Sequence, residues 1–164
     1  MKKWILLCLS ALLGYATELP TVSSVDLTRY LGRWYEIARF DHRFERGCSD
    51  VEAFYTLRED GMIGVVNRCR LQAENRTKEA NGRAYIVDEK SNAKLKVSFF
   101  WPFYGNYWII DLAEDYRYAV ISEPSQEYFW ILSRTGEMAQ DDIDHILHLA
   151  TALGFDTSKL IWRY

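Results

Sequence analysis

The sequence is poor in the residues and runs that mark several classes of protein. Its 164 residues include only 3 Pro and 9 Gly, which excludes a collagen-like or low-complexity chain. Lys and Arg form no long run, and the formal net charge is −3. Without a basic stretch to neutralise several phosphates, no nucleic-acid partner is expected.

The common catalytic motifs are missing as well. The chain contains neither a Gly-rich phosphate loop nor a Gly-x-Ser-x-Gly nucleophile turn. The nearest approach to a metal-ligand pattern is the group Asp141, Asp144, His145 and His148. At about 100° per residue these side chains lie opposite the apolar stripe of a predicted helix, and so form its solvated face. We therefore predict no metal, no cofactor and no enzymatic activity.

Residues 1–16 have the pattern of a secretory signal. Two Lys precede a ten-residue apolar run, Trp4 to Leu13, and small residues follow it. The run is too short to cross a bilayer, which takes about 20 residues. A buried N-terminal helix is the alternative. We expect an exported protein, in the periplasm or associated with the outer membrane, whose single mature domain spans 17–164.

The three Cys are an odd count, which the signal resolves. Cleavage after Ala16 removes Cys8 and leaves Cys48 and Cys69, an even pair that is a disulfide candidate in an oxidising compartment. Two buried thiols are the alternative. Cys8 lacks the small preceding residue of a lipoprotein-processing site, so we do not predict a lipid anchor there.

Apolar and polar residues alternate with period two through most of the chain, as in half-buried strands. The alternation predicts eight strands, at 33–40, 48–58, 62–69, 82–87, 93–100, 106–112, 116–122 and 128–134. Closure into an up-and-down antiparallel barrel hides all their edges. An open two-sheet sandwich is the competing architecture. Eight strands enclose room for side chains or one small ligand.

One later segment has helical spacing instead. The apolar residues on its one face are Ile143, Ile146, Leu147, Ala150 and Leu153. Asp141 or Asp142 is the expected cap, and Gly154 the expected stop. We therefore predict an amphipathic helix after the strands, followed by a last extended piece around 160–162.

Three short motifs resemble the signatures of the lipocalin family. They are Gly32-Arg33-Trp34 in the first strand, Asp115-Tyr116-Arg117 near the seventh, and Arg134 at the end of the eighth. Within the family, the stretch from Tyr35 to Gly47 is similar to the bacterial outer-membrane lipocalins, relatives of apolipoprotein D. The resemblance implies an all-β, eight-stranded barrel with one C-terminal α-helix packed outside. It also implies lipid storage or transport at the cell envelope, with fatty acids or lysophospholipids as ligands.

The strand order predicts two unlike ends of the barrel. Successive links of a meander alternate between the ends, which brings the three motifs together at one of them. The resemblance implies that Arg134 packs over Trp34 there, so that Gly32, Trp34, Asp115, Tyr116 and Arg134 have a structural role at a closed end. The links at 41–47, 70–81, 101–105 and 123–127 fall at the other end, the mouth. Cys48 and Cys69 lie near this rim, and we predict a disulfide between them.

Strand parity gives a set of inward-facing residues for a pocket. The set comprises Trp34, Glu36, Ala38, Phe40, Val51, Ala53, Tyr55, Leu95, Val97 and Phe99. In the last three strands both faces are apolar, so parity does not decide which face is inside. At the mouth, Arg39, Arg43 and Arg46 are candidates to hold an anionic head group.

An aromatic run from Phe99 to Trp108 crosses the hairpin at the mouth. An exposed run of this kind contacts a membrane or ligand tails, and local packing of a wide loop is the alternative. We expect a small lipophilic ligand, bound without chemistry, and peripheral contact with membrane. Two other functions stay open: a lipocalin-fold enzyme with Glu36 as its acid–base residue, and a homodimeric interaction module that docks through the aromatic run.

Overall fold

A computed structural model describes residues 18–163 of the chain. The predicted signal segment and Cys8 therefore lie outside the described residues. The first helix of the described residues is short, α1 (Leu27–Tyr30), and its N-cap Asp26 accepts hydrogen bonds from the backbone N–H groups of Thr28 and Arg29. This helix leads directly into the first strand.

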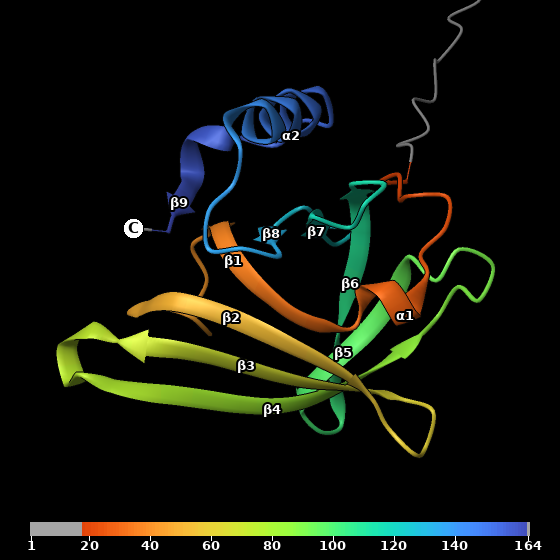
Figure 1. The fold of residues 1–164 in the computed structure, drawn as a ribbon, viewed down its shortest axis with the longest axis horizontal. Helices are drawn as coiled ribbons and strands as arrows, with labels where there is room; N and C mark the ends of the chain where they lie inside the picture. The colour runs from red at the N-terminus through yellow and green to blue at the C-terminus, as the bar shows by residue number, and fades with distance from the viewer. Residues whose placement is uncertain (1–17, 164) are drawn as a thin grey trace, which may run out of the picture.

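Eight antiparallel strands form a closed barrel (Figure 1). They are β1 (Gly32–Phe40), β2 (Cys48–Leu57), β3 (Ile63–Leu71), β4 (Arg76–Ile86), β5 (Lys94–Phe100), β6 (Phe103–Leu112), β7 (Tyr118–Ser122) and β8 (Phe129–Ser133). Each strand pairs with the next, and β1 pairs with both β2 and β8, which closes the sheet on itself. The predicted barrel is confirmed, and the open sandwich is wrong.

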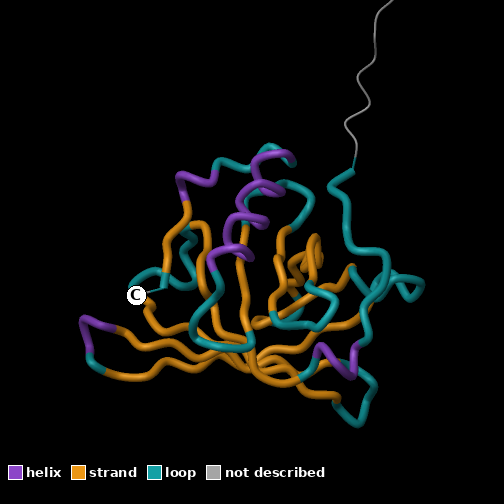
Figure 2. The backbone as a smooth tube through the Cα atoms, turned by 45° about the horizontal axis from the view of Figure 1, so that its top comes forward, coloured by secondary structure: helices purple, strands orange, loops and turns teal. Residues whose placement is uncertain are grey.

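The C-terminal helix, α2 (Gln140–Ala152), lies outside the strands (Figures 1 and 2). It begins after Ala139, which makes no side-chain cap, so the expected Asp cap is wrong. Asp141 and Asp142 fall instead in the first turn, where their charge complements the helix dipole. Gly154 follows the helix with φ +88°, the left-handed conformation that favours Gly at a helix end. The extended piece predicted around 160–162 is a last strand, β9 (Leu160–Trp162), which pairs with β1.

β3 and β4 are longer at the mouth than the predicted strands 62–69 and 82–87. β3 and β4 form a ladder from Ile63–Ala84 to Leu71–Arg76, so most of the predicted loop 70–81 is strand. A short 3₁₀ turn, Gln72–Glu74, connects the two strands. The outer part of β4, Arg76 to Glu79, is exposed on both faces and therefore lacks the alternation that marks a half-buried strand.

The apolar residues form two cores, one inside the barrel and one between the barrel wall and α2. The inner core includes Trp34, Ile109, Ala119, Ile121 and Leu132. The outer core joins Ile146 and Ala150 of α2 to wall residues that include Ile110, Val120 and Ile131. Because α2 covers this wall, β6, β7 and β8 are apolar on both faces, which is why parity in the sequence does not decide their inner face.

A bulge in β1 overturns part of the predicted pocket. The register with β8 shifts between Glu36 and Ala38, and a shift of one residue exchanges the two faces of a strand. Glu36 faces inward, but Ala38 and Phe40 belong to the outer core, so their assignment to the pocket is wrong. The Phe40 ring lies 5.3 Å from that of Phe129 and 6.2 Å from that of Phe155.

Candidate ligand-binding site

One end of the barrel is closed by a Trp that an Arg covers. The Trp34 side chain is fully buried, and its indole N–H donates to the Tyr30 carbonyl at 2.8 Å. The Arg134 guanidinium lies 3.7 Å from the centre of the Trp34 ring and donates to the carbonyls of Leu31 and Arg33 at 3.0 and 2.8 Å. The indole and the guanidinium are therefore both hydrogen-bonded, which makes this end a fixed floor.

The other residues of the three motifs lie at the same end. Gly32 has φ +96°, a backbone conformation in which a side chain is strained, and it lies beside Arg134 Nη1. The Tyr116 hydroxyl accepts from the backbone N–H of Asp26 at 2.7 Å. Asp115 accepts from the backbone N–H of Arg117 at 3.1 Å, which fixes the β6–β7 turn. These contacts tie the N-terminal segment to the floor.

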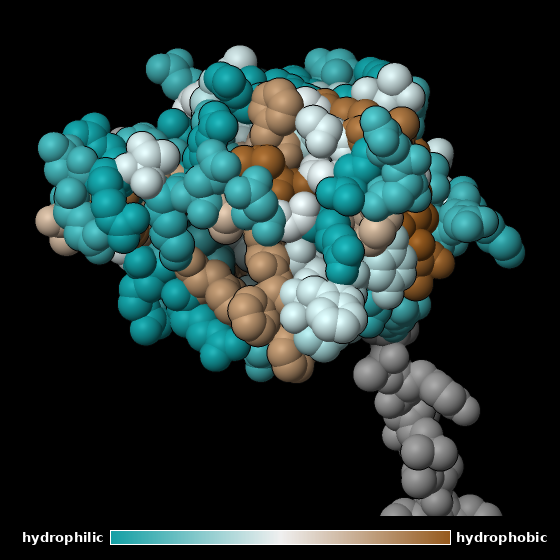
Figure 3. Space-filling view, turned by 90° about the horizontal axis from the view of Figure 1, so that it is seen from below, coloured by the Kyte–Doolittle hydropathy of each residue, from teal (hydrophilic) through white to brown (hydrophobic). Residues whose placement is uncertain are grey.

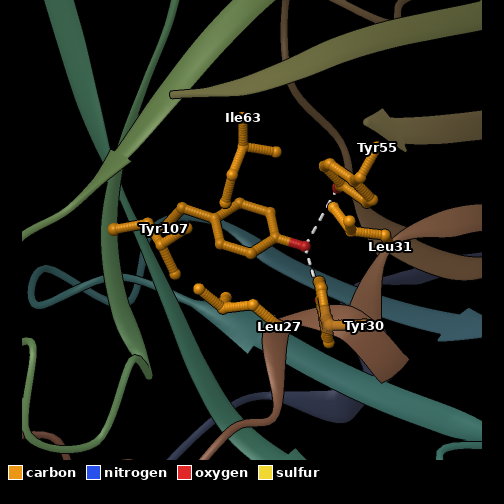
Figure 4. A pocket seen from close by; sticks show the side chains of 7 residues that line it. Leu27, Tyr30, Leu31, Tyr55, Ile63 and Tyr107 are labelled. Carbon is orange, nitrogen blue, oxygen red and sulfur yellow. Dashed lines mark hydrogen bonds between the residues drawn. The ribbon is translucent and has the colours of Figure 1, made fainter. Parts of the chain in front are cut away.

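Above the floor, three tyrosines meet inside the barrel (Figure 4). The Tyr107 hydroxyl is hydrogen-bonded to those of Tyr30 and Tyr55 at 2.7 and 3.0 Å. Burial raises the pKa of Tyr55 to about 12, so its hydroxyl stays neutral. The cavity beside this tyrosine cluster, lined also by Leu27, Leu31, Ile63 and Leu95, has a volume of about 20 Å³, room for one water.

Small side chains line the open half of the barrel, beyond the tyrosine cluster. Paired residues on neighbouring strands point to the same face, so the registers identify the inward positions. Those with small side chains are Ala53, Ala80, Gly82, Ala84 and Gly105. A Cβ built on Gly105, which is exposed, meets no atom within 4 Å, so the space in front of it is open and reaches solvent at the mouth. Figure 3 shows a hollow with a band of apolar side chains beside it, on the face where the β5–β6 hairpin lies in Figure 1.

Most of the remaining predicted pocket residues lie on the inward face. Tyr55 and Leu95 flank the tyrosine cluster, and Ala53 and Val97 continue the wall toward the mouth. Val51 is buried at the register shift in β2. The Phe99 ring lies against Gly82, within 3 Å of the position of a Cβ there. Their part in binding a ligand remains a prediction.

Several inward residues escaped the sequence analysis. Trp130 pairs with Arg39 and lies on the inner face of β8. Both faces of β8 are apolar, so the alternation in the sequence does not identify it. Asn67 pairs with Ala53 and Ala80, and its Oδ1 is buried without a hydrogen-bond partner among the described residues. Tyr30 precedes the first strand, where no strand period marks it.

Four ionisable side chains form a buried cluster at the mouth, which we call the ionic cluster: Glu36, Arg39, His42 and Glu45. Arg39 Nη1 donates to Glu36 Oε1 at 2.8 Å, and Arg39 Nη2 donates to the Glu45 carbonyl at 3.2 Å. Glu45 Oε2 lies 3.4 Å from Arg39 Nε and 3.3 Å from His42 Nε2. The His42 ring packs edge-on against that of Trp130, 5.2 Å away.

The two carboxyl groups of the ionic cluster have opposite pKa shifts. Burial, followed by the charge of Glu45, raises the pKa of Glu36 to about 9, so this carboxyl group holds a proton at neutral pH. Burial also acts to raise the pKa of Glu45, but the close approach of His42, Glu36 and Arg39 to its carboxylate outweighs burial and lowers that pKa. The pair therefore carries one negative charge, on Glu45.

The three predicted head-group arginines have different environments. Arg39 is buried in the ionic cluster, at 7% exposure. Arg46 is exposed and lies 3.4 Å from Asp41, a weak surface pair. Arg43 is exposed, its guanidinium lies 4.8 Å from the centre of the Phe44 ring, and among the described residues no carboxylate lies within salt-bridge distance of it.

The β5–β6 hairpin carries an exposed group of aromatic side chains, the aromatic lip: Phe99, Phe100, Trp101 and Phe103. The last three are 76%, 69% and 71% exposed, so local packing does not account for them. Phe100 and Phe103 stack with their rings 6.3 Å apart. Phe44, on the loop after β1, is exposed as well.

The predicted disulfide is confirmed. Cys48 and Cys69 are bonded, with their Cα atoms 5.4 Å apart, and the bond joins the start of β2 to the end of β3 beside the mouth. In the described part of the chain, no group of three or more His, Cys, Asp or Glu is arranged to hold a metal ion. His145 bonds Asp111 at 3.1 Å, on the exposed face of α2. Between residues 18 and 163, no helix combines the length and apolarity needed to cross a membrane.

Comparison with known proteins agrees with this architecture. A family model for the lipocalin-like domain matches residues 25–164. The chain is 44% identical over 163 residues to the outer membrane lipoprotein Blc of Vibrio cholerae, which covers 97% of this chain and 95% of that protein. It is 48% identical to Blc of Escherichia coli K12, over 86% of this chain and 80% of that one.

More distant relatives share the fold. Apolipoprotein D of Macaca fascicularis is 34% identical over 90% of this chain and 81% of its own. The structure of insecticyanin from the tobacco hornworm Manduca sexta superimposes with a TM-score of 0.73, covers 92% of this chain and 86% of its own, and is 22% identical, a likeness of fold alone. From the motifs, the closed barrel with its outer helix, and these matches, the chain belongs to the lipocalin family.

Proposed function

We propose that the chain binds a fatty acid or a lysophospholipid in the open half of its barrel and stores or transports it without changing it chemically. The observation that carries this proposal is the open space in front of Gly105, between the tyrosine cluster and the aromatic lip. Gly105 is exposed at the mouth, and small side chains lie on the inward face of the neighbouring strands.

The free energy of binding comes from the alkyl chain. Each methylene removed from water contributes about 0.8 kcal/mol, and a few polar groups at the rim orient the ligand. The tyrosine cluster limits the depth, because the cavity beside it, at about 20 Å³, has room for one water and not for a chain. The chain of the ligand therefore ends at the tyrosine cluster, and its polar head lies near the ionic cluster.

The proposed location is the bacterial cell envelope. The signal pattern at 1–16 favours export, and the most similar relatives reported above are named outer membrane lipoproteins. The aromatic lip supports transient contact with a membrane surface, since exposed apolar patches of this kind mark contact sites. A lipid anchor is not part of the proposal.

Lipid extracted from the purified protein and identified by mass spectrometry tests the function directly. We expect single-chain lipids in stoichiometric amount. In a parallel titration of delipidated protein, a lysophospholipid quenches Trp fluorescence and raises the melting temperature. An extract without lipid, together with no change in fluorescence or melting temperature, would contradict the proposal. Sedimentation with and without lipid tests the alternative of a homodimer joined through the aromatic lip.

A further inference from the structure

We propose that Arg39 and His42 form an anion-binding site inside the barrel mouth, which Glu45 fills in the ligand-free protein and which takes the carboxylate of a fatty acid in its place. This inference rests on the proposed function and specifies the head group that the site selects. Glu45 then acts as an internal competitor of the ligand.

Arg39 is positioned to meet a ligand inside the barrel. It pairs with Trp130 of β8, whose side chain lies in the inner core, so the two residues share the inward face. The bulge at Glu36/Ala38 causes this orientation, because without it Arg39 would point outward. A guanidinium placed inside an apolar barrel at 7% exposure requires an anion beside it.

Glu45 supplies that anion from outside the strands. It belongs to the loop 41–47 between β1 and β2, and its carboxylate reaches back to the Arg39 guanidinium and the His42 imidazole. The contacts are close but poorly aligned: Arg39 Nε, both ring nitrogens of His42 and Glu45 Oε2 are buried without a hydrogen-bond partner among the described residues. Buried donors of this kind are available to a better-placed acceptor.

The charge balance permits the exchange. Glu36 holds a proton at neutral pH, so Glu45 is the one anion that faces Arg39. A fatty-acid carboxylate that takes the place of Glu45 restores the same net charge. A neutral head group does not, and leaves Arg39 without a counter-ion if Glu45 moves away.

The loop is built to release Glu45. Its backbone–backbone hydrogen bonds, from the Glu45 N–H to the His42 carbonyl and from the Cys48 N–H to the Glu45 carbonyl, are local to 42–48. Two side chains of the barrel also donate to its carbonyls: Arg39 Nη2 to Glu45 at 3.2 Å and Lys78 Nζ to Phe44 at 3.4 Å. The disulfide of Cys48 anchors the end of the loop, and Arg43, Phe44 and Arg46 are already exposed. Outward movement therefore costs few contacts with the rest of the barrel.

The test compares oleate with oleyl alcohol, which has the same chain and no charge, by calorimetric titration of the full mature protein. Glu45→Gln removes the internal competitor, and we expect it to bind oleate about tenfold more tightly with no change for oleyl alcohol. Arg39→Gln is expected to weaken oleate binding about tenfold. Glu52→Gln is the matched control, since Glu52 lies on the outer face of β2 with Arg33, and it should change neither affinity.

The ratio of the two affinities within each variant cancels a general loss of stability. A ratio that stays at the wild-type value in both Glu45→Gln and Arg39→Gln would overturn the inference and leave the proposed function intact, since both ligands still bind. Failure of both ligands to bind wild-type protein would instead overturn the proposed function. Hydrogen exchange gives a second readout: oleate should speed exchange at 42–48, and oleyl alcohol should not. Slower hydrogen exchange at 42–48 with oleate than with oleyl alcohol would also contradict the replacement of Glu45 by the oleate carboxylate.

Discussion

The two ends of the barrel use arginine in opposite ways. At the closed end, Arg134 covers Trp34 and donates to backbone carbonyls, whose positions the fold fixes. At the mouth, Arg39 faces the carboxyl groups of two side chains, Glu36 and Glu45, and Glu45 belongs to a surface loop. The first arrangement is satisfied and fixed, whereas the second leaves buried polar atoms without partners. The difference separates a structural floor from a site that a ligand can occupy.

The largest expected effect tests the floor. Trp34→Ala removes a fully buried ring and the surface on which Arg134 lies, and we expect the free energy of unfolding to fall by about 3–5 kcal/mol. Trp101→Ala, at the exposed aromatic lip, should change it by no more than about 0.5 kcal/mol. Urea unfolding with the disulfide intact measures both. Equal losses in the two variants would mean that the two ends do not differ in this way.

The next effect concerns the pH dependence of the mouth. The pKa of Glu36 is raised to about 9 in the folded protein, so between pH 5 and 9 the folded state holds a proton that the unfolded chain releases. The contribution of this proton to the free energy of unfolding is complete below the pKa of Glu36 in the unfolded chain, and it is lost as the pH rises toward 9. Glu36→Gln cannot lose the proton, so its free energy of unfolding relative to wild type should rise by about 4 kcal/mol between pH 5 and 8, at about 1.4 kcal/mol for each pH unit.

Urea titrations at several pH values measure this difference, with Glu52→Gln as the control. Glu36→Gln keeps a group that accepts from Arg39, so the comparison isolates the charge. A difference between Glu36→Gln and wild type that stays constant over this range would show that Glu36 is ionised in the folded protein.

The smallest effect on stability belongs to the lip. Phe100→Ser with Phe103→Ser should leave the free energy of unfolding within about 0.5 kcal/mol of wild type, because both rings are more than two-thirds exposed. We expect the same double variant to bind lipid vesicles at least about tenfold more weakly, since it loses apolar surface for contact. Leu57→Ser is the control, at 68% exposure on the hairpin of the closed end. Vesicle co-sedimentation that falls equally in both would remove the lip from membrane contact.

The sequence predicts the architecture because one face of most strands is buried and the other wet. That alternation gives the eight strands and the closed barrel, and the helical spacing gives α2. The meander also predicts the closed end, where the three motifs meet, and the mouth, because successive links alternate between the two barrel ends. The disulfide follows as well, since both Cys lie near one rim.

The site was less predictable, for three physical reasons. The bulge at Glu36/Ala38 moves Ala38 and Phe40 outward and Arg39 inward, and a bulge leaves no signal in the alternation. The cover of α2 makes β6 to β8 apolar on both faces, which hid Trp130. The ionic cluster forms because the loop 41–47 folds back over the end of β1. The spacing of its four residues in the sequence therefore does not indicate a buried group.

The central claim is that the open half of the barrel holds the lipid chain, and two glycines test it most directly. A Cβ at Gly105, inside the mouth, or at Gly136, on the exposed loop after β8, meets no atom within 4 Å, and neither residue has a positive φ. Both therefore accept Phe without backbone strain. Calorimetric titration with a lysophospholipid should show binding to wild type and Gly136→Phe, and at least about tenfold weaker binding to Gly105→Phe at unchanged stability. Equal affinity in all three proteins would place the ligand elsewhere and contradict the account.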